Sequence, residues 1–177
     1  MVTSLMLVPA TTASADDRVC RTTIGARTID GNVIVPRGAR CELVGTTVKG
    51  NVEVRRGATA VIRAGAEIDG NVQGTRAHLV KVKRSDVEGD VQVDNGRRAV
   101  VRGSDVDGNI QYTSNRGRLV TVANRVDGDV QAFSNTGGVR IRDNRIEGNL
   151  QCKSNNPRPV GGNNRVDGNK EDQCRRL

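Results

Sequence analysis

Three pairs of carboxylates, each spaced two residues apart, recur at nearly regular intervals in the middle of the chain. Paired carboxylates can act as general acid and general base, and clustered carboxylate oxygens can bind Ca²⁺. Like charges at short spacing also repel by about 1 kcal/mol in water, which a bound cation would relieve. The candidate metal or acid–base residues are Glu67, Asp69, Asp86, Glu88, Asp105 and Asp107.

These acids support two other interpretations. The first is a hydrated acidic face that salt screens, with no bound ion. The second is a polysaccharide lyase or hydrolase, a reaction class that uses two carboxyl groups. Sugar enzymes usually line a cleft with aromatic platforms and long loops, whereas this chain has no Trp, one Tyr and one Phe. We therefore expect a non-catalytic protein, keep the enzyme as the alternative, and name calcium as the one candidate cofactor.

Basic residues outnumber acidic ones, 28 to 20, which gives a formal net charge of +8. A basic stripe could bind anionic cell-wall polymers such as teichoic acid or acidic polysaccharide. Nucleic acid is not an expected partner, because almost no aromatic side chains are present to stack on bases. Generic solvated charge is the alternative. The candidate anion-binding residues are Arg63, Lys81, Lys83, Arg102, Arg140 and Arg142.

The elements that must position these groups follow from a repeat. A phrase such as "VDGNIQ" recurs, and its glycine returns every 19 or 20 residues. A fixed period of this length indicates a repeat architecture and is too short for helical-pair repeats. The repeated glycines are Gly31, Gly50, Gly70, Gly89, Gly108, Gly128, Gly148 and Gly168.

Each period contains short apolar runs separated by turn residues, without helix signals, which favours two or three strands per period. The sequence therefore predicts an all-β fold, a single parallel β-helix of about eight coils, and right-handed crossovers. Equivalent residues should stack in columns at about 4.8 Å. The columns on either side of the glycine, such as Ile68 and Val72, should fill the core, and the glycine should lie where a side chain would crowd its neighbours. Polar columns are also predicted: Gln73, Gln92, Gln111, Gln131 and Gln151; Asn115, Asn135 and Asn155; Asn124, Asn144 and Asn164.

The four cysteines lie near the two ends of the repeat. Cys20 and Cys41 are 21 residues apart, and Cys152 and Cys174 are 22 apart, about one coil in each case. Neighbouring coils bring backbones within the Cα distance that a disulfide accepts. We therefore expect Cys20–Cys41 and Cys152–Cys174 disulfides that staple the terminal coils.

The first residues resemble an export signal. An apolar run over 5–9 is followed by Ala13-Ser14-Ala15, the small-x-small pattern before a cleavage site. We expect a signal peptide over 1–15 and a β-helix domain over 16–177; a basic n-region is absent, which leaves a truncated or a misassigned start as alternatives. An unstructured tail is the alternative. No segment approaches the about 20 apolar residues of a membrane span. The expected location is secreted, extracellular or in the cell wall.

The phrases "VDGNIQ" and "IEGNLQ" on a short coil resemble those of bactofilin-type, polymer-forming β-helix proteins, over roughly residues 29–169. The resemblance implies a right-handed β-helix and self-association by end-to-end stacking. The export signal and the disulfides depart from that family, whose filaments are cytoplasmic. The stretch from Gly148 to Cys174 is also similar to that of secreted actinobacterial proteins, a similarity that implies no activity.

Overall fold

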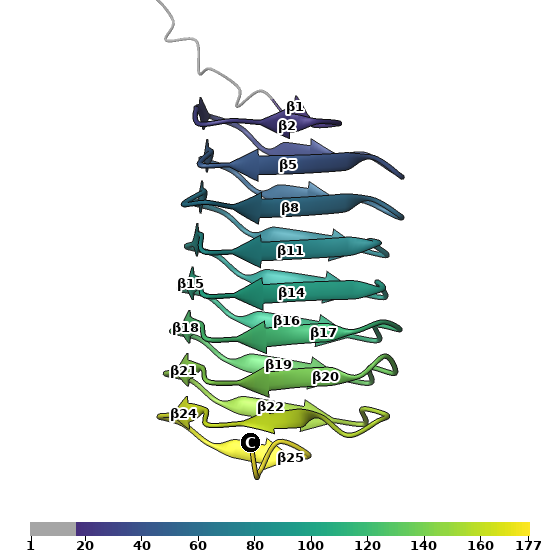
Figure 1. The fold of residues 1–177 in the computed structure, drawn as a ribbon, viewed down its shortest axis with the longest axis vertical. Coiled ribbons are helices and arrows are strands. Elements are labelled where there is room, and N and C mark those ends of the chain that lie inside the picture. The colour runs from purple at the N-terminus through teal and green to yellow at the C-terminus, as the bar shows by residue number, and fades with distance from the viewer. Residues whose placement is uncertain (1–16) are drawn as a thin grey trace, which may run out of the picture.

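Residues 17–177 are described by the structure, a computed structural model, and form one right-handed parallel β-helix of about eight coils (Figure 1). The predicted signal peptide lies outside the described residues. Three parallel sheets run along the axis. Among residues 17–177 there is no helix, and hence none long and apolar enough to cross a membrane.

Each coil contributes one strand to each sheet in turn, so strands three apart in the chain are neighbours. Sheet A, at the back in Figure 1, is formed by nine strands. They are β1 (Arg18–Val19), β4 (Val33–Val35), β7 (Val52–Val54), β10 (Val72–Thr75), β13 (Val91–Asp94), β16 (Ile110–Thr113), β19 (Val130–Phe133), β22 (Leu150–Lys153) and β25 (Lys170–Asp172).

Sheet B faces the viewer in Figure 1 and has eight strands. They are β2 (Thr23–Ile24), β5 (Arg40–Val44), β8 (Thr59–Arg63), β11 (Leu79–Lys83), β14 (Arg98–Arg102), β17 (Leu119–Val122), β20 (Val139–Arg142) and β23 (Val160–Gly162).

Sheet C closes the narrow side of the coil, at the left of Figure 1, with strands of only two residues. They are β3 (Thr28–Ile29), β6 (Thr47–Val48), β9 (Glu67–Ile68), β12 (Asp86–Val87), β15 (Asp105–Val106), β18 (Arg125–Val126), β21 (Arg145–Ile146) and β24 (Arg165–Val166).

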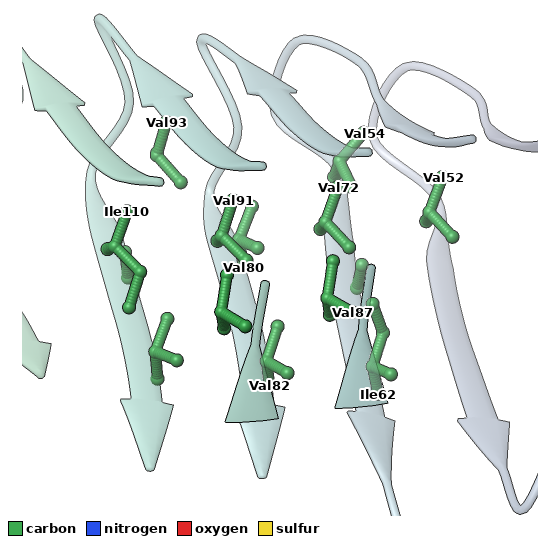
Figure 2. Close-up of a cluster of buried hydrophobic side chains, with 14 of the residues drawn as sticks. Val52, Val54, Ile62, Val72, Val80, Val82, Val87, Val91, Val93 and Ile110 are labelled. Carbon is green, nitrogen blue, oxygen red and sulfur yellow. The ribbon is translucent and has the colours of Figure 1, made fainter. Parts of the chain in front are cut away.

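The core is a stack of β-branched side chains between the sheets (Figure 2). Val72 pairs with Val52 on one side and with Val91 on the other, so the predicted column is confirmed. All three are fully buried. Alternation along each strand sends the next residue, such as Gln73, to the outer face. Tyr112 is a buried exception to the aliphatic core, and its hydroxyl lies 2.9 Å from that of Thr121.

The repeated glycine is required by close approach of neighbouring coils, as predicted. A Cβ on Gly70 would lie 2.7 Å from both the Asn51 Oδ1 and the Gly50 carbonyl oxygen. Real Cβ atoms do not come this close to backbone, so any side chain here would push two coils apart. The residue after the glycine links the neighbouring coils by a hydrogen bond. The Asn71 backbone N–H donates to Asn51 Oδ1 at 2.8 Å.

Two further asparagine ladders are buried at the other corners of the coil. Asn115, Asn135 and Asn155 form one, and Asn124, Asn144 and Asn164 form the other. Each member follows a residue in the left-handed conformation, with φ between 54° and 58°. Their polarity opposes that of the glycine corner, because the backbone N–H groups of Asn115, Asn135, Asn124 and Asn144 each donate to the Oδ1 of the next asparagine toward the C-terminus.

Both predicted disulfides are present at the ends of the solenoid. Cys20–Cys41 has a Cα–Cα distance of 5.5 Å, and Cys152–Cys174 one of 5.2 Å. All four cysteines are buried, and Cys41 and Cys152 lie one coil further from the ends than Cys20 and Cys174. Each disulfide therefore ties a terminal coil, which has a neighbour on one side only, to the coil next to it.

Candidate functional site

The outer face of sheet B carries the basic residues predicted to bind anions. Strand register places them in two columns that run along the axis. The central column contains Glu42, Val61, Lys81, Val100, Val120, Arg140 and Val160; the edge column contains Val44, Arg63, Lys83, Arg102, Val122, Arg142 and Gly162. The structure thus brings all six predicted anion-binding residues onto one face, with neighbouring coils about 4.8 Å apart.

Two of these six residues have acidic partners. Arg63 donates to Glu42 at 2.8 Å, and this hydrogen bond holds the pKa of the Glu42 carboxyl below its usual value. Arg142 donates to Asp143, also at 2.8 Å. Within residues 17–177, Lys81, Lys83, Arg102 and Arg140 form no ion pair, so their charges face solvent.

The face is also partly apolar, which the sequence did not predict. Four of the seven central-column residues are valines, with Val100 and Val120 in succession between Lys81 and Arg140, and Val122 interrupts the edge column between Arg102 and Arg142. Val61 is only 5% exposed and Val160 is 54% exposed. The aliphatic stems of Lys and Arg can cover such valines while their charged ends remain in water.

The predicted acidic residues lie on sheet C and its following turn. Asp86 pairs directly with Glu67 of one neighbouring coil and Asp105 of the other. Partial burial raises the pKa of the Asp86 carboxyl, and the charges of Asp105, Glu67 and Asp107 raise it further. The carboxylates repel one another as predicted. A shallow hollow of about 360 Å³ lies here, lined by Lys49, Glu67, Ile68, Asp69, Asp86 and Glu88.

One built-in cation compensates part of this acidic charge. Lys49 Nζ lies 2.9 Å from Asp69 Oδ2, and this contact raises the pKa of Lys49. In residues 17–177 no group of three or more His, Cys, Asp or Glu side chains converges as metal ligands would. The acids form a stripe along the axis, and calcium binding there stays a prediction.

The acids of the later coils are paired with arginines. Arg125 contacts Asp127 at 3.1 Å in its own coil and Glu147 at 2.7 Å in the next. Arg145 and Arg165 both approach Asp167 at 3.7 Å. Sheet C therefore changes from an acidic stripe to a neutral ladder of ion pairs at Arg125.

Sheet A presents a third kind of outer surface. Gln73, Gln92, Gln111 and Gln131 stack in register, and Gln131 pairs with Gln151. The predicted amide ladder is continuous only in part: Gln131 donates to Gln151 at 2.9 Å, whereas Gln92 donates to Asp90 of its own coil. The stacked glutamines therefore lie on sheet A, the unpaired cations Lys81, Lys83, Arg102 and Arg140 on sheet B, and the acidic stripe of the middle coils on sheet C.

The six predicted anion-binding residues do not include Arg118 and Arg158, which the structure places beside the same basic face. Together with Arg140 they line a hollow of about 270 Å³ near the C-terminal end of sheet B. A signal is present in the sequence, because Arg118, Gly138 and Arg158 are spaced by 20 residues. Because Gly138 has no side chain, the space between the side chains of Arg118 and Arg158 in this column is not filled.

Comparison with protein-family models, curated proteins and solved structures finds no match to this chain. The resemblance to bactofilin-type proteins therefore rests on the repeated phrases alone. The fold and its faces define the class: a right-handed parallel β-solenoid with disulfides near both ends and one basic outer face. The two disulfides are consistent with an oxidising compartment.

Proposed function

We propose that this protein is an exported, non-catalytic β-solenoid that binds anionic cell-wall polymers through the outer face of sheet B. The observation that carries the proposal is the segregation of unpaired cations onto this face, with Lys81, Lys83 and Arg102 in adjacent coils. Successive cations about one coil apart can contact successive anionic groups of one polymer, so weak contacts add up through effective concentration.

A charge-reversal pair tests which face binds. The first variant combines Lys81→Glu, Lys83→Glu and Arg102→Glu on sheet B. The matched control combines Arg56→Glu, Arg97→Glu and Arg116→Glu, exposed residues of the turns between sheets A and B. Both variants change the net charge equally, so a difference between them reports position and not total charge.

The measurement is retention on immobilised teichoic acid, acidic polysaccharide and heparin over a salt series. We expect wild type and the turn control to be retained at low salt and released as salt rises, since exposed charges are screened within about 10 Å at 0.1 M. The sheet B variant should elute without retention. Equal loss in both variants, or retention that salt does not reduce, would contradict the proposed face.

The second candidate is a carbohydrate-active enzyme that uses the acidic hollow on sheet C. The raised pKa of Asp86 favours it, because a general acid must hold a proton that its neighbours do not. Turnover of an acidic glycan that disappears in Asp86→Asn and survives in Asp127→Asn would support the enzyme. A purified protein that binds glycans without cleaving them supports the binding function.

A further inference from the structure

We propose that the hollow around Gly138 is a binding site for a single phosphate group, held by Arg118, Arg140 and Arg158. The site deepens the proposed function and rests on it, since it would hold one phosphate of a bound polymer. The hollow lies where β20 and β23 meet the preceding turns. Its remaining lining is Gly137, Val139, Pro157 and Val160.

The strand register explains why the hollow exists. Leu119 pairs with Val139, and Arg140 pairs with Val160. Arg118 and Gly138 lie one residue before the first pair, and Gly138 and Arg158 lie two residues before the second pair, so the three fall in one column. The two arginines are two coils, or about 10 Å, apart with no side chain between them.

Gly138 cannot readily be replaced by most residues, because its φ is +84°. A Cβ there would meet only Pro157 Cγ, at 4.0 Å. The space beside Gly138 is therefore open. Arg118 of the preceding coil, Arg158 of the following coil and Arg140 of the same coil line it. Equivalent positions in earlier coils carry side chains, including Leu79 and Arg98.

The three arginines are without internal counterions. Within residues 17–177, none of them forms an ion pair or a side-chain hydrogen bond, unlike Arg142, which is bonded to Asp143. Three like charges around one cavity repel one another, and an anion placed between them converts this repulsion into attraction. The structure thus provides positive charge and open space at the same place.

The chemistry of the lining points to phosphate. A guanidinium presents a planar fork of donors that matches two phosphate oxygens, and three such forks can surround a tetrahedral group. Val160 and Pro157 form an apolar wall beside the charges. That wall suits the carbon skeleton of a phosphoester, such as the glycerol or sugar of a polymer repeat. A second hollow, lined in part by Arg142 and Gly162, continues from Arg140 and Val160 and leaves room for the rest of the chain.

Isothermal titration and amide NMR of the full chain test the site with two probes, inorganic phosphate and a glycerol-phosphate polymer. We expect both to shift the amides of Gly137, Gly138 and Val160. The double variant Arg140→Gln and Arg158→Gln should weaken phosphate binding about tenfold or more, since it removes two charged hydrogen-bonding groups. Gly138→Asn should do the same without changing charge, because asparagine tolerates positive φ and fills the hollow.

The matched control is Lys83→Gln with Arg102→Gln, which removes the same charge from the same face outside the hollow. It should leave phosphate affinity within about twofold while lowering polymer retention. Phosphate binding that the control weakens equally, or that sodium chloride of the same ionic strength abolishes, would overturn the inference. The proposed function fails separately, if the sheet B charge reversal leaves polymer retention unchanged.

Discussion

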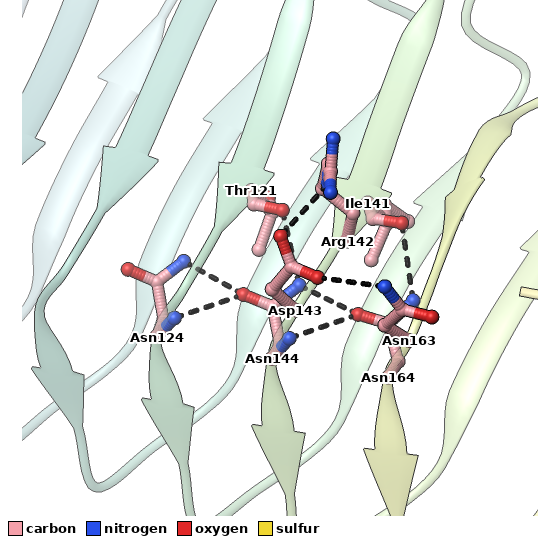
Figure 3. A network of polar contacts seen from close by, with 8 residues as sticks. All are labelled: Thr121, Asn124, Ile141, Arg142, Asp143, Asn144, Asn163 and Asn164. Atoms are coloured by element: carbon pink, nitrogen blue, oxygen red, sulfur yellow. Dashed lines mark hydrogen bonds and ion pairs between the residues drawn. The ribbon is translucent and has the colours of Figure 1, made fainter.

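The buried asparagine ladders allow a sharp test of how the coils are held together. Asn144 is 1% exposed and occupies the middle of one ladder (Figure 3). Its Oδ1 accepts from the backbone N–H and the Nδ2 of Asn124, both at 3.0 Å. Its Nδ2 donates to the Thr121 carbonyl at 3.0 Å and to Asn164 Oδ1 at 2.8 Å.

Replacing Asn144 by Ala removes all four of these hydrogen bonds. The backbone N–H of Asn124 and one of its Nδ2 hydrogens then have no partner. Each buried donor left unsatisfied costs about 1–3 kcal/mol, so we expect the free energy of unfolding to fall by about 2–6 kcal/mol. Asn169→Ala is the matched control, because Asn169 is exposed and only its backbone forms hydrogen bonds, its N–H donating to Asn149 Oδ1 and its carbonyl accepting from the Leu150 N–H. Its effect should lie within about 0.5 kcal/mol.

Denaturant unfolding with intact disulfides measures the difference. The chain has no Trp and a single Tyr, so intrinsic fluorescence reports Tyr112 beside Thr121, and far-ultraviolet circular dichroism reports the sheets. Asn144→Asp separates hydrogen bonding from volume, because the carboxylate keeps the acceptors and loses the donors. It should be worse than Ala at neutral pH and recover partly in acid. A loss below about 1 kcal/mol for Asn144→Ala would refute the reasoning.

Three further predictions follow from the coil geometry and its charges. Gly70→Ala should destabilise the fold strongly, because its Cβ would meet Asn51 and the Gly50 carbonyl, whereas Gly25→Ala, with nothing within 4 Å, should be tolerated; thermal melts compare them. Because the pKa of Asp86 is raised in the folded protein, ionisation of this carboxyl disfavours folding. The stability that protonated Asp86 contributes is present below pH 3.8, the ordinary pKa, and is lost as the pH rises through the raised pKa of the folded state. Asp86→Asn should therefore raise the melting temperature at neutral pH and have little effect at low pH, and a lower melting temperature at pH 7 would contradict this. Replacing Cys152 and Cys174 by Ser should lower stability by about 3 kcal/mol in the chain-entropy model, with hydrogen exchange speeding up first in β23, β24 and β25; uniform acceleration over all coils would argue against a local staple.

The fold was predictable because one coil imposes the same demands on every repeat. The glycine recurs since backbone approaches backbone there, and Val72 must resemble Val52 and Val91 since each packs on the next. The cysteine pairing follows from the same period. The burial of Asn124 and Asn144 was not predictable, because asparagine at a turn usually faces water, and only the corner geometry points these amides inward.

The candidate site was predictable only where strand alternation applies. Residues such as Lys81 and Lys83 lie within β11, so a period of two assigns them to the outer face. Arg118 and Arg158 lie in the turns before β17 and β23, where alternation assigns no direction. The 20-residue spacing of Arg118, Gly138 and Arg158 indicates a shared column, but the direction of the two arginine side chains depends on the corner between sheets A and B.

In this repeat, packing between coils constrains the inward positions, whereas the outward positions are free to vary. Inward positions are constrained by coil-to-coil packing to buried side chains without charge, although the residue type varies: one inward column of sheet A runs through Val54, Gly74, Val93, Tyr112, Ala132 and Cys152. The outer central column of sheet B has no such constraint, since it runs through Val61, Lys81, Val100 and Arg140. Charge at those positions contributes little to the stack and is free to serve binding. Gly138 is likewise not required by the repeat. The equivalent positions of the preceding and following coils are Arg118 and Arg158, so the coil accepts a side chain at this position. The opening is a local departure from the repeat, and it coincides with three uncompensated arginines.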